Sequence, residues 1–153
     1  QMCIRDRLIA IHTPLIAVDG TFRQREGGLT GPEYIRAIKQ RYAGVSIMAD
    51  ISTVEEAVAC REAGADCVST TLCGYTPQTA EESKHGPSVE MLKRCVEALP
   101  GCPVFAEGRY NTPVEAASAI EAGAWAVVVG SAITRPHIIT QWFADAVRGA
   151  AVK

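Results

Sequence analysis

The sequence has no long apolar run and no block of like charge. Its apolar stretches are interrupted within a few residues, far short of the roughly 20 that cross a bilayer, so we expect no membrane insertion. Basic and acidic residues are interspersed at a net charge of −2, without a basic stripe, so we expect no nucleic-acid partner. The first residues do not follow the pattern of a secretory leader, and we expect a cytoplasmic location.

The six cysteines lack the spacing of a metal site. They include no Cys-x-x-Cys pair, and no histidine stands at zinc-ligand spacing beside them. Cys60, Cys67 and Cys95 lie among Ala, Val and Leu, where cysteine behaves as a small hydrophobic residue. We therefore expect buried thiols, no metal and no disulfide framework.

From residue 14 onward, short apolar runs alternate with amphipathic segments of helical length. Each run is apolar throughout, which predicts strands covered on both faces, as in a parallel sheet. Strict alternation of strand and helix predicts an α/β fold. The expected strands are Leu15–Val18, Val45–Ala49, Asp66–Thr70, Val104–Ala106 and Trp125–Val129. The expected helices are Pro32–Tyr42, Val54–Ala63, Ser88–Ala98, Pro113–Ala122 and Pro136–Arg148.

An internal repeat relates two of these units. Residues 53–65 parallel residues 112–124, each with a Thr at the helix start and Gly-Ala after the helix end. A period of two strand–helix units is typical of a (β/α)8 barrel. An open doubly wound sheet would also alternate strand and helix. We favour the barrel and leave closure open.

Acidic residues follow three of the five expected strands. They are Asp19, Asp50 and Glu107, and the repeat puts Asp50 and Glu107 at equivalent places. The reacting groups of βα barrels lie at the carboxyl ends of the strands. Any one of these acids could simply cap a loop. Together they predict an acidic mouth suited to hydroxyl recognition and proton transfer.

Two glycine-containing loops predict an anion site. Gly130 and Ser131 follow the last strand and open a short helix whose free N–H groups could hold a phosphate, with Arg135 nearby. Gly108 and Arg109 occupy the matching position after the preceding strand. A strand end and a helix cap would explain each glycine alone, but the pair favours phosphate binding.

The loop at residues 70–76 carries three Thr hydroxyls and one Tyr hydroxyl around a glycine. Thr71 and Tyr75 are its candidate sugar-binding side chains. The same residues could equally form a turn that satisfies its own hydrogen bonds.

Several stretches resemble the bacterial N-acetylmannosamine-6-phosphate 2-epimerases. The resemblance runs over roughly residues 14–148, in order and with similar spacing. Its most specific parts are the Glu-Gly-Arg-Tyr-Asn-Thr-Pro motif at 107–113 and the Gly-Ser-Ala-Ile-Thr-Arg motif at 130–135. The others are residues 17–23, 48–53, 70–76 and 123–129.

The resemblance implies an isomerase that inverts C2 of N-acetylmannosamine 6-phosphate, in sialic-acid and amino-sugar catabolism, with no cofactor. Glu107 then matches the glutamate that assists proton transfer, Asp50 the aspartate that contacts the sugar, and Arg135 a substrate-binding arginine. Gly108, Gly130 and Ser131 fall in its phosphate loops. The implied partner is an amino-sugar phosphate, and a homo-oligomer is also expected.

The resemblance also implies an incomplete barrel. The family's catalytic lysine precedes the first strand seen here, so we expect a single domain over residues 1–153 that holds five C-terminal βα units and lacks three. Residues 1–7 fit neither pattern well and are expected to be the frayed end of a preceding helix, or foreign or disordered sequence. A non-catalytic sugar-phosphate-binding module and another phosphate-binding barrel enzyme remain alternatives.

Overall fold

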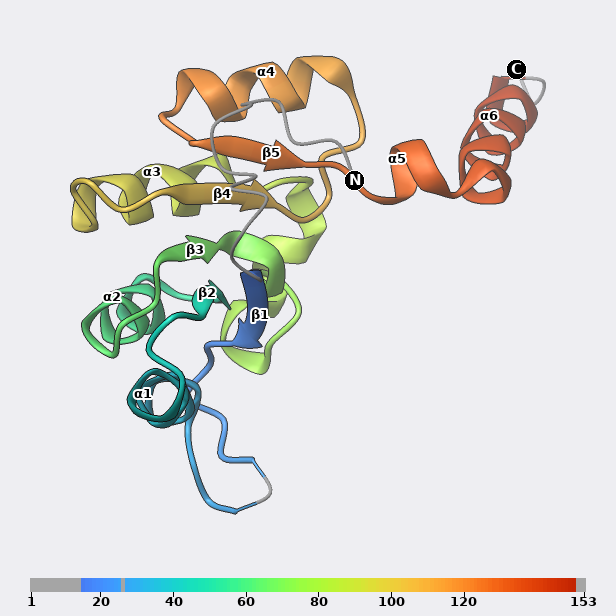
Figure 1. Ribbon diagram of the computed structural model, residues 1–153. Helices are drawn as coiled ribbons and strands as arrows, with labels where there is room; N and C mark the ends of the chain where they lie inside the picture. The colour runs from blue at the N-terminus through green and yellow to red at the C-terminus, as the bar shows by residue number, and fades with distance from the viewer. Residues whose placement is uncertain (1–14, 26, 151–153) are drawn as a thin grey trace.

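The computed structural model describes residues 15–25 and 27–150, and its centre is one parallel sheet (Figure 1). The strand order β1-β2-β3-β4-β5 follows the chain, and every neighbouring pair is parallel. The expectation of five parallel strands is therefore confirmed. The strands are β1 Leu15–Asp19, β2 Ser46–Asp50, β3 Cys67–Ser69, β4 Val104–Glu107 and β5 Ala126–Val128.

A helix follows each strand, with additional short helices in two connections. The five expected long helices are confirmed, with ends that differ by at most two residues. These are α1 Gly31–Arg41, α2 Val54–Glu62, α3 Val89–Ala98, α4 Pro113–Glu121 and α6 Pro136–Ala150. The short ones are the 3-10 helices η1 Thr70–Leu72 and η2 Pro77–His85, and helix α5 Ser131–Thr134. Sequence analysis expected α5 but neither of the 3-10 helices.

Strand order distinguishes between the two α/β architectures that the sequence allowed, a (β/α)8 barrel and an open doubly wound sheet. A doubly wound sheet reverses its strand order at a switch point and carries helices on both faces. Here the order never reverses, and α1 to α4 cover the same face of the sheet (Figure 1). Five sequential strands with helices on one side form an arc of a (β/α)8 barrel.

Side-chain alternation gives the sheet two unlike faces. One face and the helices share the main core, in which Ile35 of α1, Ile47 of β2 and Leu92 of α3 have no exposed surface. The opposite face, which would line a barrel, carries a small cluster of Cys67, Phe105 and Ala126. This second face contains the acidic ends of the strands.

The expectation that every strand is covered on both faces is wrong for β1. Leu15 is 46% exposed and Ile16 is 42% exposed, although both belong to a continuous apolar run. The cause is position, because β1 is an edge strand and pairs only with β2 in the described sheet. An apolar run shows that a strand can be buried, and the number of strands and helices packed beside it determines how much of it is buried.

The internal repeat folds into two equivalent connections. Thr53 and Thr112 accept hydrogen bonds from the backbone N–H groups of Glu56 and Glu115, and both helix starts form complete capping boxes. Each helix ends before a glycine with positive φ, 108° at Gly64 and 97° at Gly123, a conformation that glycine adopts without strain. The repeated residues therefore form the same N-terminal cap, helix and glycine turn in both places.

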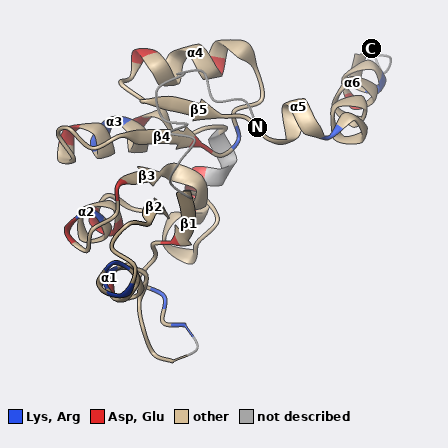
Figure 2. Ribbon diagram, in the orientation of Figure 1, with Lys and Arg blue, Asp and Glu red and all other residues tan. Residues whose placement is uncertain are grey.

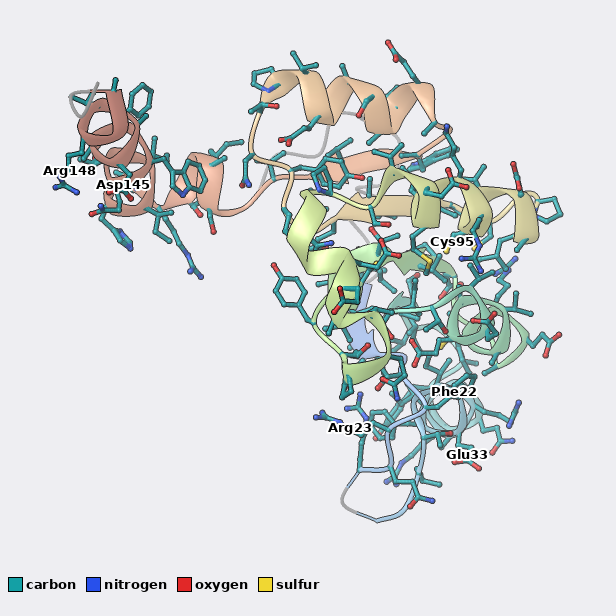
Figure 3. The ribbon with its side chains drawn as sticks, turned by 180° about the vertical axis from the view of Figure 1, so that it is seen from behind. Phe22, Arg23, Glu33, Cys95, Asp145 and Arg148 are labelled. Atoms are coloured by element: carbon teal, nitrogen blue, oxygen red, sulfur yellow. The ribbon has the colours of Figure 1, made fainter. Side chains whose placement is uncertain are left out.

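The last two helices project from the body of the molecule (Figure 1). Figure 3 shows Cys95 within the body, whereas Asp145 and Arg148 lie together on the separate helix α6. No residue of α6 is buried, and Phe143 is 71% exposed. Among the described residues, no helix is both long and apolar enough to cross a bilayer. Residues 1–7, which were expected to be foreign or disordered, lie outside the described part.

Ile47 and Ile16 are register partners on β2 and β1 and provide a matched pair for testing the core. Replacing the fully buried Ile47 with Ala should lower the free energy of unfolding by about 2–5 kcal/mol, because it leaves a cavity under the helices. Ile16→Ala should cost less than about 1 kcal/mol, because the side chain is already partly solvated. Urea unfolding followed by circular dichroism measures both. Equal losses would contradict the difference in burial between the central strand β2 and the edge strand β1.

Candidate active site

The three strand-end acids all lie at the carboxyl edge of the sheet. Asp19 and Asp50 are register partners at the ends of β1 and β2, and Glu107 ends β4. Ala49 and Ala106, which precede two of them, belong to the core under the helices. Since side chains alternate along a strand, Asp50 and Glu107 point from the opposite face. Within the described strands these acids are the only charged residues, and Figure 2 shows charge mainly on helices and loops.

Hydroxyl groups connect Asp50 to Glu107. The Thr71 Oγ1 lies 2.9 Å from Asp50 Oδ1 and 2.8 Å from Ser69 Oγ. The Ser69 hydroxyl donates in turn to Glu107 Oε2 at 3.0 Å. Ser69 ends β3 between the two acidic strands, so the β3–η1 segment bridges their carboxyl groups.

Thr70 fixes the backbone of Glu107. Its hydroxyl donates to the Glu107 carbonyl at 2.9 Å and accepts from the Glu107 N–H at 3.0 Å. Thr70 is buried, as is Ser69. Glu107 is therefore held at its main chain by Thr70 and at its side chain by Ser69, which restricts where its carboxylate can move.

The surroundings of Asp50 favour its neutral form. Burial raises the pKa of Asp50 to about 6, although the hydrogen bond from Thr71 acts in the opposite direction. The negative charges of Glu107 and Asp19 add to the increase in pKa. A carboxyl group that titrates near neutrality can both donate and accept a proton under physiological conditions.

Asp19 has a different environment. Thr21 donates to its Oδ1 from both backbone and side chain, at 3.0 and 2.7 Å. Arg25 and Arg23 pair with Oδ2 at 3.0 and 3.3 Å. Partial burial acts to raise the pKa of Asp19, but these hydrogen bonds and charges outweigh it and the pKa is lowered. Asp19 stays ionised and orders the loop after β1.

The two predicted glycine loops border one cavity of about 350 Å³. Glu107 and Gly108 line it from the end of β4, Gly130 and Ser131 from the end of β5, and Thr71 and Tyr75 from the η1 side. Gly108 has a φ of 102°, which a side chain would strain. Gly130 has open space where a side chain would stand, so its backbone can be approached closely.

Arg109 contributes to this cavity in an unexpected way. Its guanidinium donates to the carbonyl oxygens of Gly86, Cys73 and Glu82 at 2.6, 2.7 and 3.2 Å. It also lies over the Tyr75 ring, 5.4 Å from the centroid. Arg109 therefore ties the long β3–α3 connection to the end of β4. Its backbone φ of 61° is unusual for a residue with a side chain.

Arg135 does not join the other predicted site residues. It caps the C-terminal end of α5, is exposed, and is absent from the residues that line the cavity. Helix α5 leads away from the sheet (Figure 1), although Ile138 and Trp142 of α6 line the cavity. Asp50 and Asp19 also stand outside the cavity lining, but Asp50 reaches Glu107 through Thr71 and Ser69.

Ser69 and Thr70 are site residues that were not predicted from the sequence. Period-two alternation from Cys67 would have put Ser69 on the inner face, because Cys67 packs there with Phe105. Tyr110, Asn111 and Trp142 also line the cavity without having been predicted. Tyr110 and Asn111 belong to the motif at 107–113 that carries the family resemblance, which could have pointed to them, whereas no motif marks Trp142.

Of the five cysteines among the described residues, four are buried, as expected. Burial raises the pKa of Cys60, Cys67 and Cys95 to about 12, so these thiols remain protonated. In the described part of the chain, no group of three or more His, Cys, Asp or Glu side chains is arranged to hold a metal ion.

The raised pKa of Asp50 predicts a pH-dependent stability. Because the folded state keeps the Asp50 proton up to about pH 6, its stabilising contribution is full below the ordinary value of 3.8 and disappears as the pH rises through about 6. Wild type should therefore lose roughly 1–2 kcal/mol relative to Asp50→Asn between pH 4 and pH 7, after allowance for solvent screening. Urea unfolding of both proteins at each pH measures this difference. Parallel pH profiles would show that Asp50 has an ordinary pKa.

Comparison with known proteins identifies the family. The family model described as "Putative N-acetylmannosamine-6-phosphate epimerase" matches residues 3–149. Three curated proteins, each named "Putative N-acetylmannosamine-6-phosphate 2-epimerase", represent its relatives. The protein of Caldanaerobacter subterraneus is 45% identical over 90% of this chain, that of Cutibacterium acnes 47% over 88%, and that of Escherichia coli O157:H7 45% over 95%.

A solved structure agrees with the sequence comparison. It is that of the N-acetylmannosamine-6-phosphate 2-epimerase from Clostridium perfringens, which is 43% identical and superposes with a TM-score of 0.77 over 86% of this chain. The chain spans 56% of that structure and 57–59% of the three curated relatives. The match over nearly its whole length shows that the chain belongs to the N-acetylmannosamine-6-phosphate epimerase family.

Proposed function

We propose that this chain supplies the C-terminal half of the active site of an enzyme that interconverts N-acetylmannosamine 6-phosphate and N-acetylglucosamine 6-phosphate. The reaction inverts C2 by removing a proton from one face and returning one to the other. The observation that carries the proposal is that Glu107, an acid–base group, shares one cavity with Gly108, Gly130 and Ser131.

The chemistry explains why an acid and an anion cradle belong together. The C2 hydrogen is acidic only in the open-chain sugar, where the carbanion spreads onto the aldehyde oxygen. A base must remove the proton, a donor must stabilise the oxygen, and a proton must return. The distant phosphate serves as an anchor that fixes C2 relative to Glu107.

The phosphate is proposed to bind between the two glycine loops. The first N–H groups of a helix have no acceptor within it, and in α5 the first such bond runs from Ile133 to the Gly130 carbonyl. The N–H groups of Ser131 and Ala132 are therefore available to phosphate oxygens, and the open space at Gly130 lets the anion approach the backbone. Arg109 retains two N–H donors beyond the three it uses in the loop, and these can reach the same anion.

Sugar hydroxyls are proposed to bind nearer the middle of the sheet. Asp50, Thr71 and the exposed Tyr75 offer acceptors and donors there, and Asp19 holds the neighbouring loop in place. Arg135 contacts substrate only if α5 turns its C-terminal end toward the cavity. The proton-transferring lysine implied by the family resemblance belongs to an earlier strand of the complete barrel.

A homo-oligomer remains part of the proposal. Helix α6 presents Phe143 and Val147 to solvent, and these side chains are 71% and 68% exposed. Apolar side chains of this size, gathered on one projecting helix, favour burial against another surface. A cytoplasmic location also remains a proposal.

Deuterium exchange tests the function directly. The three upstream strand–helix units of the Clostridium perfringens enzyme would be joined to this chain and the chimera assayed with N-acetylmannosamine 6-phosphate in deuterated water. Deprotonation at C2 must place solvent deuterium at that carbon, which NMR detects. Glu107→Gln should lower the exchange rate by about 10²–10⁴-fold, the usual contribution of a general acid–base group.

Controls separate loss of chemistry from loss of structure. Ser118→Ala, which removes a hydroxyl on α4 outside the site, should exchange like the parent chimera. The 153-residue chain alone should not exchange, since the resemblance assigns the C2 proton to the upstream lysine. A folded chimera that binds the sugar phosphate without exchanging deuterium would refute the proposed reaction.

A further inference from the structure

Four oxygen-bearing side chains form a continuous line across three strands. From Asp50 Oδ1 the line passes to Thr71 Oγ1 at 2.9 Å, then to Ser69 Oγ at 2.8 Å, and then to Glu107 Oε2 at 3.0 Å. Each of the three separations is short enough for an O–H···O hydrogen bond. The line joins the strand-end acids of β2 and β4 without a gap.

If both acids are ionised, the line contains too few hydrogens for its three contacts. Each hydroxyl carries one hydrogen, so Thr71 and Ser69 supply two hydrogens for three contacts. If Thr71 donates to Asp50 and Ser69 donates to Glu107, two oxygens without a hydrogen between them face each other at 2.8 Å. If both hydroxyls point toward Glu107, Thr71 presents a lone pair to the Asp50 carboxylate.

One additional proton satisfies every contact. With the proton on Asp50, the hydrogen bonds run from Asp50 through Thr71 and Ser69 to Glu107. With the proton on Glu107, they run in the reverse direction. Both arrangements use the same oxygen positions, so neither requires a heavy atom to move.

The charges around the line favour retention of one proton. Asp50 faces Asp19 on β1, Cys67 on β3 and Glu107 on β4. Asp19 is neutralised by Arg23 and Arg25, and the Cys67 thiol stays protonated. Burial together with the nearby negative charges raises the pKa of Asp50 to about 6.

We propose that Ser69 and Thr71 are positioning residues of a proton relay through which Asp50 and Glu107 share a single proton. In one passage the Asp50 O–H bond breaks as the Thr71 O–H bond re-forms, the original Thr71 hydrogen moves to Ser69, and the original Ser69 hydrogen moves to Glu107. One negative charge moves from Glu107 to Asp50. No other reactant is consumed.

The relay gives Glu107 a proton source within the protein. Thr70 holds the Glu107 backbone, so the Ser69–Glu107 contact persists while the carboxyl group changes charge. Its use in catalysis rests on the proposed function: after Glu107 has given a proton to the sugar, Asp50 restores it. The sharing of the proton is a property of the free protein.

Carbon-13 NMR of the full chain tests the sharing in the absence of any sugar. The carboxyl carbons of Asp50 and Glu107 are followed between pH 3 and pH 9. A shared proton predicts that both carbons titrate in the same two steps. Two single-step curves with separate midpoints would show a proton localised on one acid, and would overturn the relay.

Variants separate the relay from simple charge repulsion. Ser69→Ala leaves both carboxyl groups in place but removes the link, so each carbon should then titrate in one step. Thr71→Val should do the same, Thr71→Ser should restore the two-step curves, and Ser118→Ala should leave them unchanged. Two-step curves that persist in both Ser69→Ala and Thr71→Val would assign the coupling to charge alone and refute the relay. Failure of the deuterium assay would leave this result untouched.

Discussion

Packing of α1 to α4 against a single face of the sheet is the constraint on which the rest of the structure depends. Ile47, Val68 and Val127 fill that face with the helices, and their neighbours along each strand must then point to the other side. The opposite face is free to carry polar groups at its carboxyl edge. Asp50, Ser69 and Glu107 lie there because alternation leaves them no place in the main core.

The chemical properties of the site follow from the hydrogen bonds that its polar side chains make with one another. Ser69 and Thr70 are buried and use their hydroxyls on Glu107, while Thr71 bridges to Asp50. Burial favours the neutral form of Asp50, whereas hydrogen bonds from Thr21 and the charges of two arginines lower the pKa of Asp19. Two aspartates that are register partners therefore have opposite protonation preferences, set by their local partners.

The elements and the acidic edge could be predicted from sequence because both depend on local pattern. Apolar runs, capping Thr residues and a repeated Gly-Ala define the units, and an acid after a strand must lie at the carboxyl edge. The apolar run of β1 alone predicts a covered strand, and its exposure follows from the incomplete barrel, which places β1 at the edge of the described sheet. The bonds of Arg109 to Cys73, Glu82 and Gly86 connect residues that are distant in sequence, and no pattern marks them.

The same distinction holds within the site. Thr71 was a candidate for sugar binding or for a self-satisfied turn, and its contact with Asp50 crosses 21 positions of sequence. Gly130 and Ser131 were predicted from their place after a strand, and they do border the cavity that contains Glu107. Arg135, only a few residues further on, follows α5 away from it. A place directly after a strand end therefore predicted the position of Gly130 and Ser131 at the cavity, but not that of Arg135.

The most direct measurement of the central claim is the response of the backbone N–H signals of Gly108, Gly130 and Ser131 to sugar ligands. Nitrogen-15 NMR of the chain would compare N-acetylglucosamine 6-phosphate with N-acetylglucosamine at equal concentrations. The account predicts saturable shifts of all three signals with the phosphorylated sugar and none with the unphosphorylated one. Equal responses to both ligands, or shifts confined to other parts of the chain, would contradict it.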